Sequence, residues 1–283
     1  MKRIIYSIYV DIPAKEHFGE STNRHDSVAK ANVTIDAFKE HYDRLITSKK
    51  DYADTLGVTF KMYEYDEQYK TFEKNFTKDF PEFTGYEVIN FYKIHILNEL
   101  AKDYDEILYL DFDAIPMTDD NFFEVWDLSK GICVLNNTAS VVTNLNINHS
   151  IRSPTAKYFN CQAMLIDSGY DHRNSVINTG IIGARKEDVI NLDFFGGFRD
   201  TIDLMTRLRF SDNGLYPQNI IDMFRYDNET IFSYKVQVND VNLQWLDAQW
   251  HYFFDWQGYI PVETKIVHAI CKDFACVWRR IDA

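Results

Sequence analysis

Two aspartates with one residue between them, Asp111 and Asp113, follow directly after the apolar run "ILYL" at residues 107–110. Residues i and i+2 of an extended segment project to the same side, so both carboxylates can face one ligand. Two carboxylates that lie close together repel each other and raise one pKa, unless a cation neutralises them. The spacing therefore predicts a strand that delivers two oxygen ligands to a divalent metal ion.

The position of this pair is more informative than its presence. A chain with this much aspartate contains such triplets by chance, and "DYD" at 103–105 is another. Residues 111–113, in contrast, come directly after a predicted buried strand. In open α/β sheets, ligands bind beyond the carboxyl ends of the strands, where side chains from several strands converge. We therefore place a site at this strand end.

Predicted strands and helices alternate through the first half of the chain. One helical pattern starts at Ser27, a favourable N-cap, continues with apolar residues at steps of three and four, and can end at Gly57. Further strands are predicted at 3–10, 58–65, 106–111 and 131–137, and further helices at 87–104 and 120–128. This alternation predicts an α/β fold with a mainly parallel sheet flanked by helices.

The second half is less regular. The stretch from Thr138 to Ser175 is polar and aperiodic, so we expect loops there. Strands are predicted at 176–185, 232–238 and 264–270, and helices from Lys186 to about Arg209 and at 218–227. Because no repeat, low-complexity tract or Pro/Gly-rich linker divides the chain, we expect residues 1–283 to form a single domain.

Composition excludes several classes of protein. The net charge is −13, and the chain shows no Lys/Arg cluster of the kind that holds phosphate backbones, so we expect no nucleic-acid partner. No apolar run reaches the roughly 18–20 residues of a membrane span or forms a signal peptide at the start. The four cysteines lack zinc-site spacing and are expected to be free thiols. We expect a soluble, cytoplasmic protein without a transmembrane segment.

Residues 93–116, "KIHILNELAKDYDEILYLDFDAIP", resemble the corresponding stretch of GT-A-fold glycosyltransferases. The stretch is most similar to the glycogenin-like and lipopolysaccharide-galactosyltransferase-like enzymes of glycosyltransferase family 8. Three further segments follow in that family's order: "VINTGIIGARKED", "YPQNIID" and "KIVHAICKDFACVW". The resemblance implies a GT-A fold and a metal-dependent transferase that moves a sugar from a nucleotide-sugar donor to a hydroxyl of a glycan or another acceptor. It also implies a nucleotide-binding half of about residues 1–130 and an acceptor-binding half of about residues 131–283.

The resemblance assigns the metal ligands. Asp111 would touch the metal or the donor ribose, Asp113 would ligate the metal, and His268 would complete the site. Imidazole beside carboxylates suits Mn²⁺ better than Mg²⁺, so manganese is the expected cofactor and magnesium the alternative. The other interpretation of His268 is a buried histidine on an apolar strand.

The resemblance also assigns residues to the nucleotide. Tyr9 and Asp11 would meet the base, Lys93 matches a basic residue on the helix before the D-x-D strand, and Lys272 would contact the pyrophosphate. Here Cys271 replaces the family's usual glycine and the lysine comes early. Core packing for Tyr9, and solvated surface positions for the two lysines, remain as alternatives.

Two residues are the catalytic candidates. Asn178, with Gly180, matches the segment that lines the donor sugar, and Gln218 matches the glutamine beneath the reacting sugar carbon, although Pro217 replaces the preceding aspartate. An amide cannot act as a useful base at neutral pH, so the resemblance predicts net retention. A base would instead point to inversion, with Asp212 and Asp222 as its nearest candidates in sequence.

The donor and the acceptor are predicted less closely. The glycogenin-like resemblance favours a uridine diphosphate sugar, and the aromatic residues of 245–259 form either an acceptor platform or core. A haloacid-dehalogenase-like phosphatase also places D-x-D after an apolar strand, and a non-catalytic sugar-binding module is the third possibility. The oligomeric state is not predicted.

Overall fold

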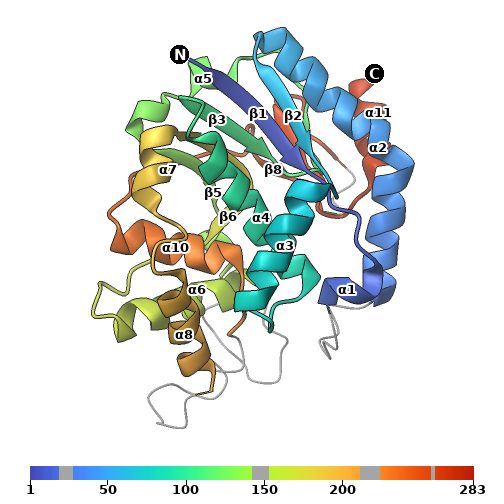
Figure 1. Ribbon diagram of the computed structural model, residues 1–283. Helices are drawn as coiled ribbons and strands as arrows, with labels where there is room; N and C mark the ends of the chain where they lie inside the picture. Colours follow the sequence, from blue (N-terminus) through green and yellow to red (C-terminus); the bar gives the residue numbers. More distant parts are fainter. Residues whose placement is uncertain (19–27, 142–152, 211–223, 256–258) are drawn as a thin grey trace.

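Strand β1 (Arg3–Ile8) lies inside a six-stranded sheet with the order β2-β1-β3-β6-β5-β7. The computed structural model describes residues 1–18, 28–141, 153–210, 224–255 and 259–283 (Figure 1). The other strands of this sheet are β2 (Thr59–Tyr63), β3 (Glu106–Leu110), β5 (Ile132–Asn136), β6 (Ile177–Arg185) and β7 (Leu243–Trp245).

The sheet is mixed, with more parallel than antiparallel pairings. Strand β1 runs parallel to β2 and β3, and β5 runs parallel to β7, whereas β6 is antiparallel to both β3 and β5. Helices flank the sheet (Figure 1). The predicted α/β class is therefore confirmed, and the reversed direction of β6 is the feature that alternation of elements did not predict.

Alternate residues of β1 enter two different cores, as expected of a strand buried on both faces. Ile4, Tyr6 and Ile8 join a core with α3 (Glu67–Asp79), α4 (Gly85–Leu100), α7 (Lys186–Leu192), α8 (Phe198–Arg209) and α10 (Asn228–Val238). Ile5 faces the second core, which includes α2 (Val28–Leu56) and α5 (Phe122–Val125). The result is a sheet with an apolar layer on each side.

A second, three-stranded sheet brings the C-terminal region to the end of β3. Its order is β4 (Ala114–Pro116), β9 (Ile266–His268) and β8 (Tyr252–Phe253). Strand β4 is antiparallel to β9, with Ala114 opposite His268. This sheet packs with α2 and α11 (Phe274–Ile281) in a third core. Residues more than 150 positions apart in the chain thus meet beside the D-x-D triplet.

Local signals account for the ends of the two long N-terminal helices. Helix α4 begins with a capping box, in which Thr84 accepts from the Glu87 backbone N–H and the Glu87 carboxylate accepts from that of Thr84. Helix α2 ends at Leu56, and Gly57 follows with φ +65°, a conformation that glycine adopts without strain. The predicted end of α2 is confirmed.

Several predictions for the second half are wrong. Helix α6 (Ser153–Asp167) lies in the stretch predicted as loops, and the single helix predicted at 186–209 is two helices, α7 and α8. The chain turns between them at Asp193 and Gly197, which both have positive φ. Residues 232–238, predicted as a strand, belong to α10, because contacts with α6 and β6 decide the state of this β-branched segment.

Three helices of the structure were not predicted, and one predicted helix lies mostly outside the described residues. Helices α1 (Ala14–Phe18), α3 and α11 had no counterpart in the predictions. Of the helix predicted at 218–227, residues 218–223 lie outside the described residues, and 224–227 are not helical. All four cysteines are free, as predicted. No helix in the described part of the chain is both long and apolar enough to cross a membrane.

Candidate metal and nucleotide site

The D-x-D triplet forms a turn between β3 and β4. The Asp111 N–H donates to the Gly180 carbonyl oxygen at 2.7 Å, and the Ala114 N–H donates back to the Asp111 carbonyl oxygen at 2.9 Å. The two aspartates therefore do not lie side by side on one extended strand, as the i, i+2 argument had assumed. The turn still brings both carboxylates together, because one oxygen of each lies within 4.8 Å of the other and of His268. Strand β4, which follows the turn, belongs to the second sheet.

His268 completes a cluster with the two carboxylates. Its Nε2 lies 3.6 Å from Asp111 Oδ2 and 3.5 Å from Asp113 Oδ1. One potential ligand atom from each of the three residues lies within 4.8 Å of the others. The pairing of β4 with β9, in which Ala114 lies opposite His268, positions the imidazole beside the two aspartates.

The outer oxygens of the two carboxylates already have partners. Asp111 Oδ1 accepts from the Tyr109 hydroxyl and lies 3.5 Å from Lys93 Nζ, and Asp113 Oδ2 pairs with Lys272 Nζ. Burial by itself would raise the pKa of Asp113, but Lys272 and His268 hold it well below its usual range. The inner oxygens are the ones that face His268. Each aspartate thus has one oxygen paired with a neighbour and the other turned inward.

This donor set fits a divalent cation. Two carboxylate oxygens and one imidazole nitrogen are ligands that Mn²⁺ accepts, and the 3.5–3.6 Å separations are too long for good hydrogen bonds between His268 and the carboxylates. Gly180 leaves the necessary room, because a Cβ there would lie 2.3 Å from His268 Cε1 and 2.9 Å from Asp111 Oδ2. The residues therefore fit the metal that the sequence predicts.

Asn178 and Gly180 lie behind this cluster on β6. The Asn178 side-chain oxygen accepts from the Gly180 N–H at 3.0 Å, and its amide nitrogen donates to Glu229 Oε1 at 2.9 Å. The Thr179 carbonyl oxygen between them accepts from Lys93 at 3.3 Å. Each polar group of this segment has a partner, so the segment is held in one conformation next to Asp111.

Glu229, in the first turn of α10, is the centre of a second charged cluster. Its Oε1 accepts from the Thr179 N–H at 2.9 Å and the Asn178 amide, and its Oε2 pairs with Lys157 of α6. Although burial opposes the charged form, Lys157 and Lys93 lower the pKa of Glu229. Glu229 was missed because residues 232–238 were predicted as a strand. The "DNET" at 227–230, a typical helix start, was the available signal.

Lys49 of α2 lies beneath the D-x-D turn and is fully buried. Its ammonium donates to the Phe112 carbonyl oxygen at 2.8 Å and the Leu45 carbonyl oxygen at 3.1 Å. Burial lowers the pKa of Lys49 to about 7. Lys49 lies on the same apolar face of the predicted helix as Leu45 and Tyr52, and this position was a signal that the sequence offered.

A cavity of about 570 Å³ opens beyond the carboxyl ends of β1 and β2. Tyr9 and Asp11, which the resemblance assigns to the base, line it together with Lys39, Tyr42, Asp43, Glu64, Tyr65 and Asp66. The Tyr9 ring stacks on Phe112 with centroids 4.6 Å apart. Asp11 pairs with Lys39 at 3.0 Å. One face of Tyr9 is therefore occupied by packing against Phe112 of the D-x-D turn.

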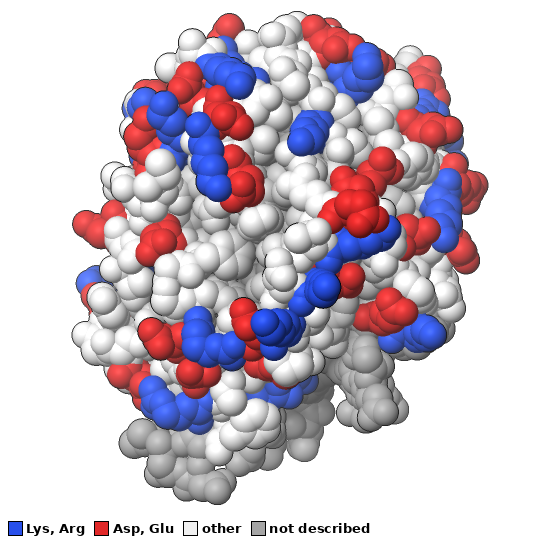
Figure 2. Space-filling view, viewed as in Figure 1, with Lys and Arg blue, Asp and Glu red and all other residues white. Residues whose placement is uncertain are grey.

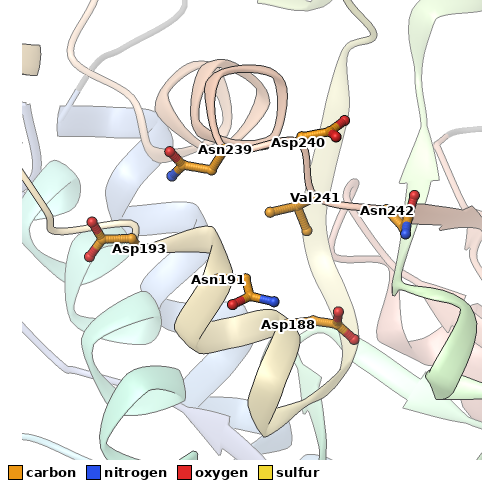
Figure 3. Close-up of a pocket in the computed structure, with 7 residues that line it drawn as sticks. All are labelled: Asp188, Asn191, Asp193, Asn239, Asp240, Val241 and Asn242. Carbon is orange, nitrogen blue, oxygen red and sulfur yellow. The ribbon is translucent and has the colours of Figure 1, made fainter.

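A separate cavity of about 380 Å³ lies at the other edge of the sheet. It is lined by Asp188, Asn191, Asp193, Asn239, Asp240, Val241 and Asn242 (Figure 3). Its residues belong to α7, to Asp193 directly after it and to the segment after α10, and α7 begins where β6 pairs with the start of β3. This acidic cavity is therefore not part of the D-x-D site.

The predicted site residues that the structure describes meet in one region. Lys93, Asp111, Asp113, His268 and Lys272 form contacts with one another, as described above. Asn178 and Gly180 lie against them, and Tyr9 and Asp11 line the neighbouring cavity. Gln218 lies outside the described residues, as do Asp212 and Asp222. Positive and negative side chains are interspersed on the face shown in Figure 2, which is unlike a basic patch for nucleic acid.

Comparison with known proteins identifies a family model and several similar folds. The model described as Glycosyl transferase family 8 matches residues 17–191, which is well over half of the chain. No curated protein matches the sequence.

Solved structures resemble the chain over most of its length. An active-site mutant of LgtC has a TM-score of 0.50 at 12% identity, covering 94% of this chain and 87% of that chain. LgtC in complex with donor and acceptor sugar analogs has a TM-score of 0.47 at 11% identity, with the same coverage of 94% and 87%. Mouse xyloside xylosyltransferase 1 has a TM-score of 0.46 at 11% identity, covering 96% of this chain and 98% of that chain. At 12% identity the first likeness concerns the fold, and it confirms the predicted GT-A class.

Proposed function

The chain belongs to glycosyl transferase family 8, and from this premise we propose that it transfers a sugar from a uridine diphosphate sugar to a hydroxyl acceptor, with manganese as cofactor. The observation that carries the proposal is the convergence of Asp111, Asp113 and His268 from two separate sheets. Membership of the family makes the chain a glycosyltransferase, so the phosphatase and the non-catalytic module are set aside. The cytoplasmic location and the division into two halves at about residue 130 remain predictions.

The residues around the cluster are suited to a leaving diphosphate. When a sugar–phosphate bond breaks, negative charge grows on the departing phosphate oxygen, and positive charge held in place lowers the barrier. Asp111, Asp113 and His268 would hold the Mn²⁺, which supplies Lewis-acid stabilisation of both phosphates. Lys272 is the protein's own cation at this position, where Asp113 raises the pKa of its ammonium although burial opposes it. We propose that, when the donor binds, the Lys272 ammonium leaves its ion pair with Asp113 and pairs with the β-phosphate instead.

The cavity beside β1 is the proposed binding site for the uracil and ribose. Its acidic side chains, Asp11, Asp43, Glu64 and Asp66, accept hydrogen bonds and would repel a phosphate. A base with N–H donors suits this lining, and the diphosphate would extend from there toward Asp111. Tyr9 offers its edge or remaining face rather than a free ring, because Phe112 covers the other face.

Net retention is the proposed stereochemical course. Inversion needs a carboxylate that is free to take the acceptor proton. Asp111 and Asp113 belong to the cation site, and Glu229 has its two oxygens committed to Asn178, Thr179 and Lys157. Asp227 caps α10 through Thr230. Each of these four carboxylates, all in the described region around the site, is therefore engaged by a partner or assigned to the cation, and none is free to take the acceptor proton. Gln218, predicted beneath the sugar carbon, cannot serve as a base.

One experiment tests donor, metal and stereochemistry together. Nucleotide sugars are screened for thermal stabilisation of the protein with Mn²⁺, with Mg²⁺ and with a chelator, and the product made from the best donor is analysed by NMR. We expect stabilisation by a uridine diphosphate sugar that requires Mn²⁺, and an α-linked product from an α-linked donor. Tight binding of guanosine diphosphate without any of uridine diphosphate would refute the donor assignment. A β-linkage would show that a base exists, with Asp212 and Asp222 as the candidates.

A further inference from the structure

We propose that His251 is a positioning residue for the metal site: its Nε2 accepts the Nδ1–H of His268, which leaves the Nε2 lone pair of His268 directed at the inner oxygens of Asp111 and Asp113. The inference rests on the proposed metal site and adds a residue that neither the family resemblance nor the D-x-D spacing indicates. In the sequence, His251 is one member of the aromatic run "QWHYFFDW".

The geometry of the two histidines carries the proposal. His251 Nε2 lies 2.9 Å from His268 Nδ1, and the two side chains are buried, with 2% and 5% of their residues exposed. Water therefore has little access to either nitrogen. At 2.9 Å this is a hydrogen bond, and it contains one proton, which belongs either to His268 or to His251.

The two arrangements differ in what His268 presents to the carboxylates. If His268 is protonated on Nδ1 and donates to His251, its Nε2 carries a lone pair and can ligate a cation. If His251 donates instead, neutral His268 carries its proton on Nε2, which then faces Asp111 and Asp113 as a donor. Only the first arrangement is compatible with a metal on Nε2. A partner on the other ring nitrogen is the usual means by which proteins fix this tautomer.

The local fold holds the His251 ring against His268. Its backbone N–H donates to the Asp247 carbonyl oxygen at 3.0 Å, and the Trp250 N–H donates to Asp247 Oδ1 at 3.0 Å. The His251 ring also packs edge-on against Phe253. Its Nδ1 has no partner among the described residues, in either arrangement, so it does not itself select one. The cation would make that selection, and His251 can accept because its own proton can reside on Nδ1.

Three variants separate this role from simple packing. His251→Phe keeps an aromatic ring but removes the acceptor, and His251→Gln removes the ring but offers an amide oxygen that can accept. His95→Phe is the matched control, since His95 is a partly buried histidine of α4 that stacks on Phe72 outside the site. Mn²⁺ affinity is measured by EPR titration without nucleotide, and thermal unfolding is measured in chelator to monitor the fold.

We expect His251→Phe to weaken Mn²⁺ binding about 10- to 100-fold. We expect His251→Gln to retain affinity within a few-fold and His95→Phe to bind like the wild type. Wild-type affinity in His251→Phe would overturn the inference, and so would an equal loss in the Phe and Gln variants, because packing would then explain both.

A second measurement uses the wild-type protein alone, so it tests the proposal even if His251→Phe does not fold. In ¹⁵N-histidine-labelled wild-type protein with Mg²⁺ or Zn²⁺ bound, long-range ¹H–¹⁵N spectra report which ring nitrogen of His268 carries the proton. The proposal requires it on Nδ1, and a proton on Nε2 in the metal-bound protein overturns it.

The proposed function and this inference fail in different ways. Wild-type protein that binds no divalent metal would refute the metal site together with His251's role. Wild-type protein that binds Mn²⁺ while His251→Phe is unaffected would refute only the role of His251. Metal binding without sugar transfer would leave the inference standing and count against the proposed reaction alone.

Discussion

Two buried charged clusters lie side by side at the carboxyl end of β3, and they are organised in opposite ways. In the cluster of Asp111, Asp113 and His268, the outer carboxylate oxygens have partners, while the inner oxygens face an imidazole nitrogen at 3.5–3.6 Å. In the cluster of Glu229 and Lys157, the carboxylate accepts from Asn178 and Thr179 on one oxygen and pairs with the lysine on the other.

The difference shows how the fold separates carboxylates that can bind a cation from carboxylates that stabilise the backbone. A carboxylate whose hydrogen-bonding capacity is fully used by the protein stabilises the backbone but has nothing left for a ligand. The first cluster keeps inner ligand atoms that one bound cation can satisfy together. The second cluster holds β6 at the residues that back the first. Variants at each cluster should therefore affect metal affinity and stability to different degrees.

The largest effect is expected for Asp113→Ala, which removes one of the inner oxygens. We expect Mn²⁺-dependent turnover to fall by at least about 100-fold, because charge stabilisation of the leaving group is lost, while circular dichroism stays native. Asp119→Ala, at an exposed aspartate of the following segment, is the control and should have normal activity. Mn²⁺-dependent turnover at the wild-type level in Asp113→Ala would sink the metal assignment. His268→Ala should act in the same direction with a smaller loss.

Glu229→Gln tests the second cluster, because it removes the charge but keeps an accepting oxygen for Asn178 and Thr179. Lys157 is then left partly buried without its counter-ion, and unfolding in urea should show a loss of about 2–3 kcal/mol. Adding Lys157→Met should restore part of that stability. Mn²⁺ affinity should remain within about twofold of the wild type. An affinity loss like that of Asp113→Ala would show that the two clusters are not separate.

Gly180→Ala introduces a methyl group at the boundary between the clusters. The new Cβ would lie 2.3 Å from His268 Cε1 and 2.9 Å from Asp111 Oδ2, so the two metal ligands must shift. We expect Mn²⁺ to bind about 10- to 100-fold more weakly, because the His268 ligand is displaced from its position. Gly183→Ala on the same strand is the matched control, because its Cβ would meet Phe122 at 2.5 Å in the core. It should lose about 1–3 kcal/mol of stability and keep its metal affinity.

The smallest effect concerns pH and Lys49. The pKa of Lys49 is lowered to about 7 in the folded protein, against about 10.4 in an unfolded chain. Between these values the unfolded lysine holds a proton that the folded one has lost, so stability rises with pH across this window, by up to about 1.4 kcal/mol per pH unit. Urea unfolding in chelator at pH 7.5 and 9 should show that Lys49→Met lacks this contribution. Parallel pH profiles for the two proteins would contradict the assigned pKa.

Local patterns were sufficient for the first half of the fold. Burial on both faces makes β1 and β3 continuous apolar runs, and the 3.6-residue period and the following glycine identify α2, so these elements could be predicted without their neighbours. The same patterns failed for α6 and for α10, which pack against each other, with α10 also contacting β6. A β-branched or aperiodic segment carries too little local preference to resist such contacts.

The site divides in the same way. The sequence by itself determined that two carboxylates follow a buried strand and that a histidine ends another apolar strand, because residue type and alternation are local properties. Only the tertiary structure decided that these side chains meet, since the pairing of β4 with β9 joins residues 114 and 268. It also supplied the neighbours that spacing cannot reveal: Lys49 beneath the turn, Glu229 behind β6 and His251 against His268. Each of them reaches the site through hydrogen bonds to residues that are distant in the sequence, and no local pattern encodes such a bond.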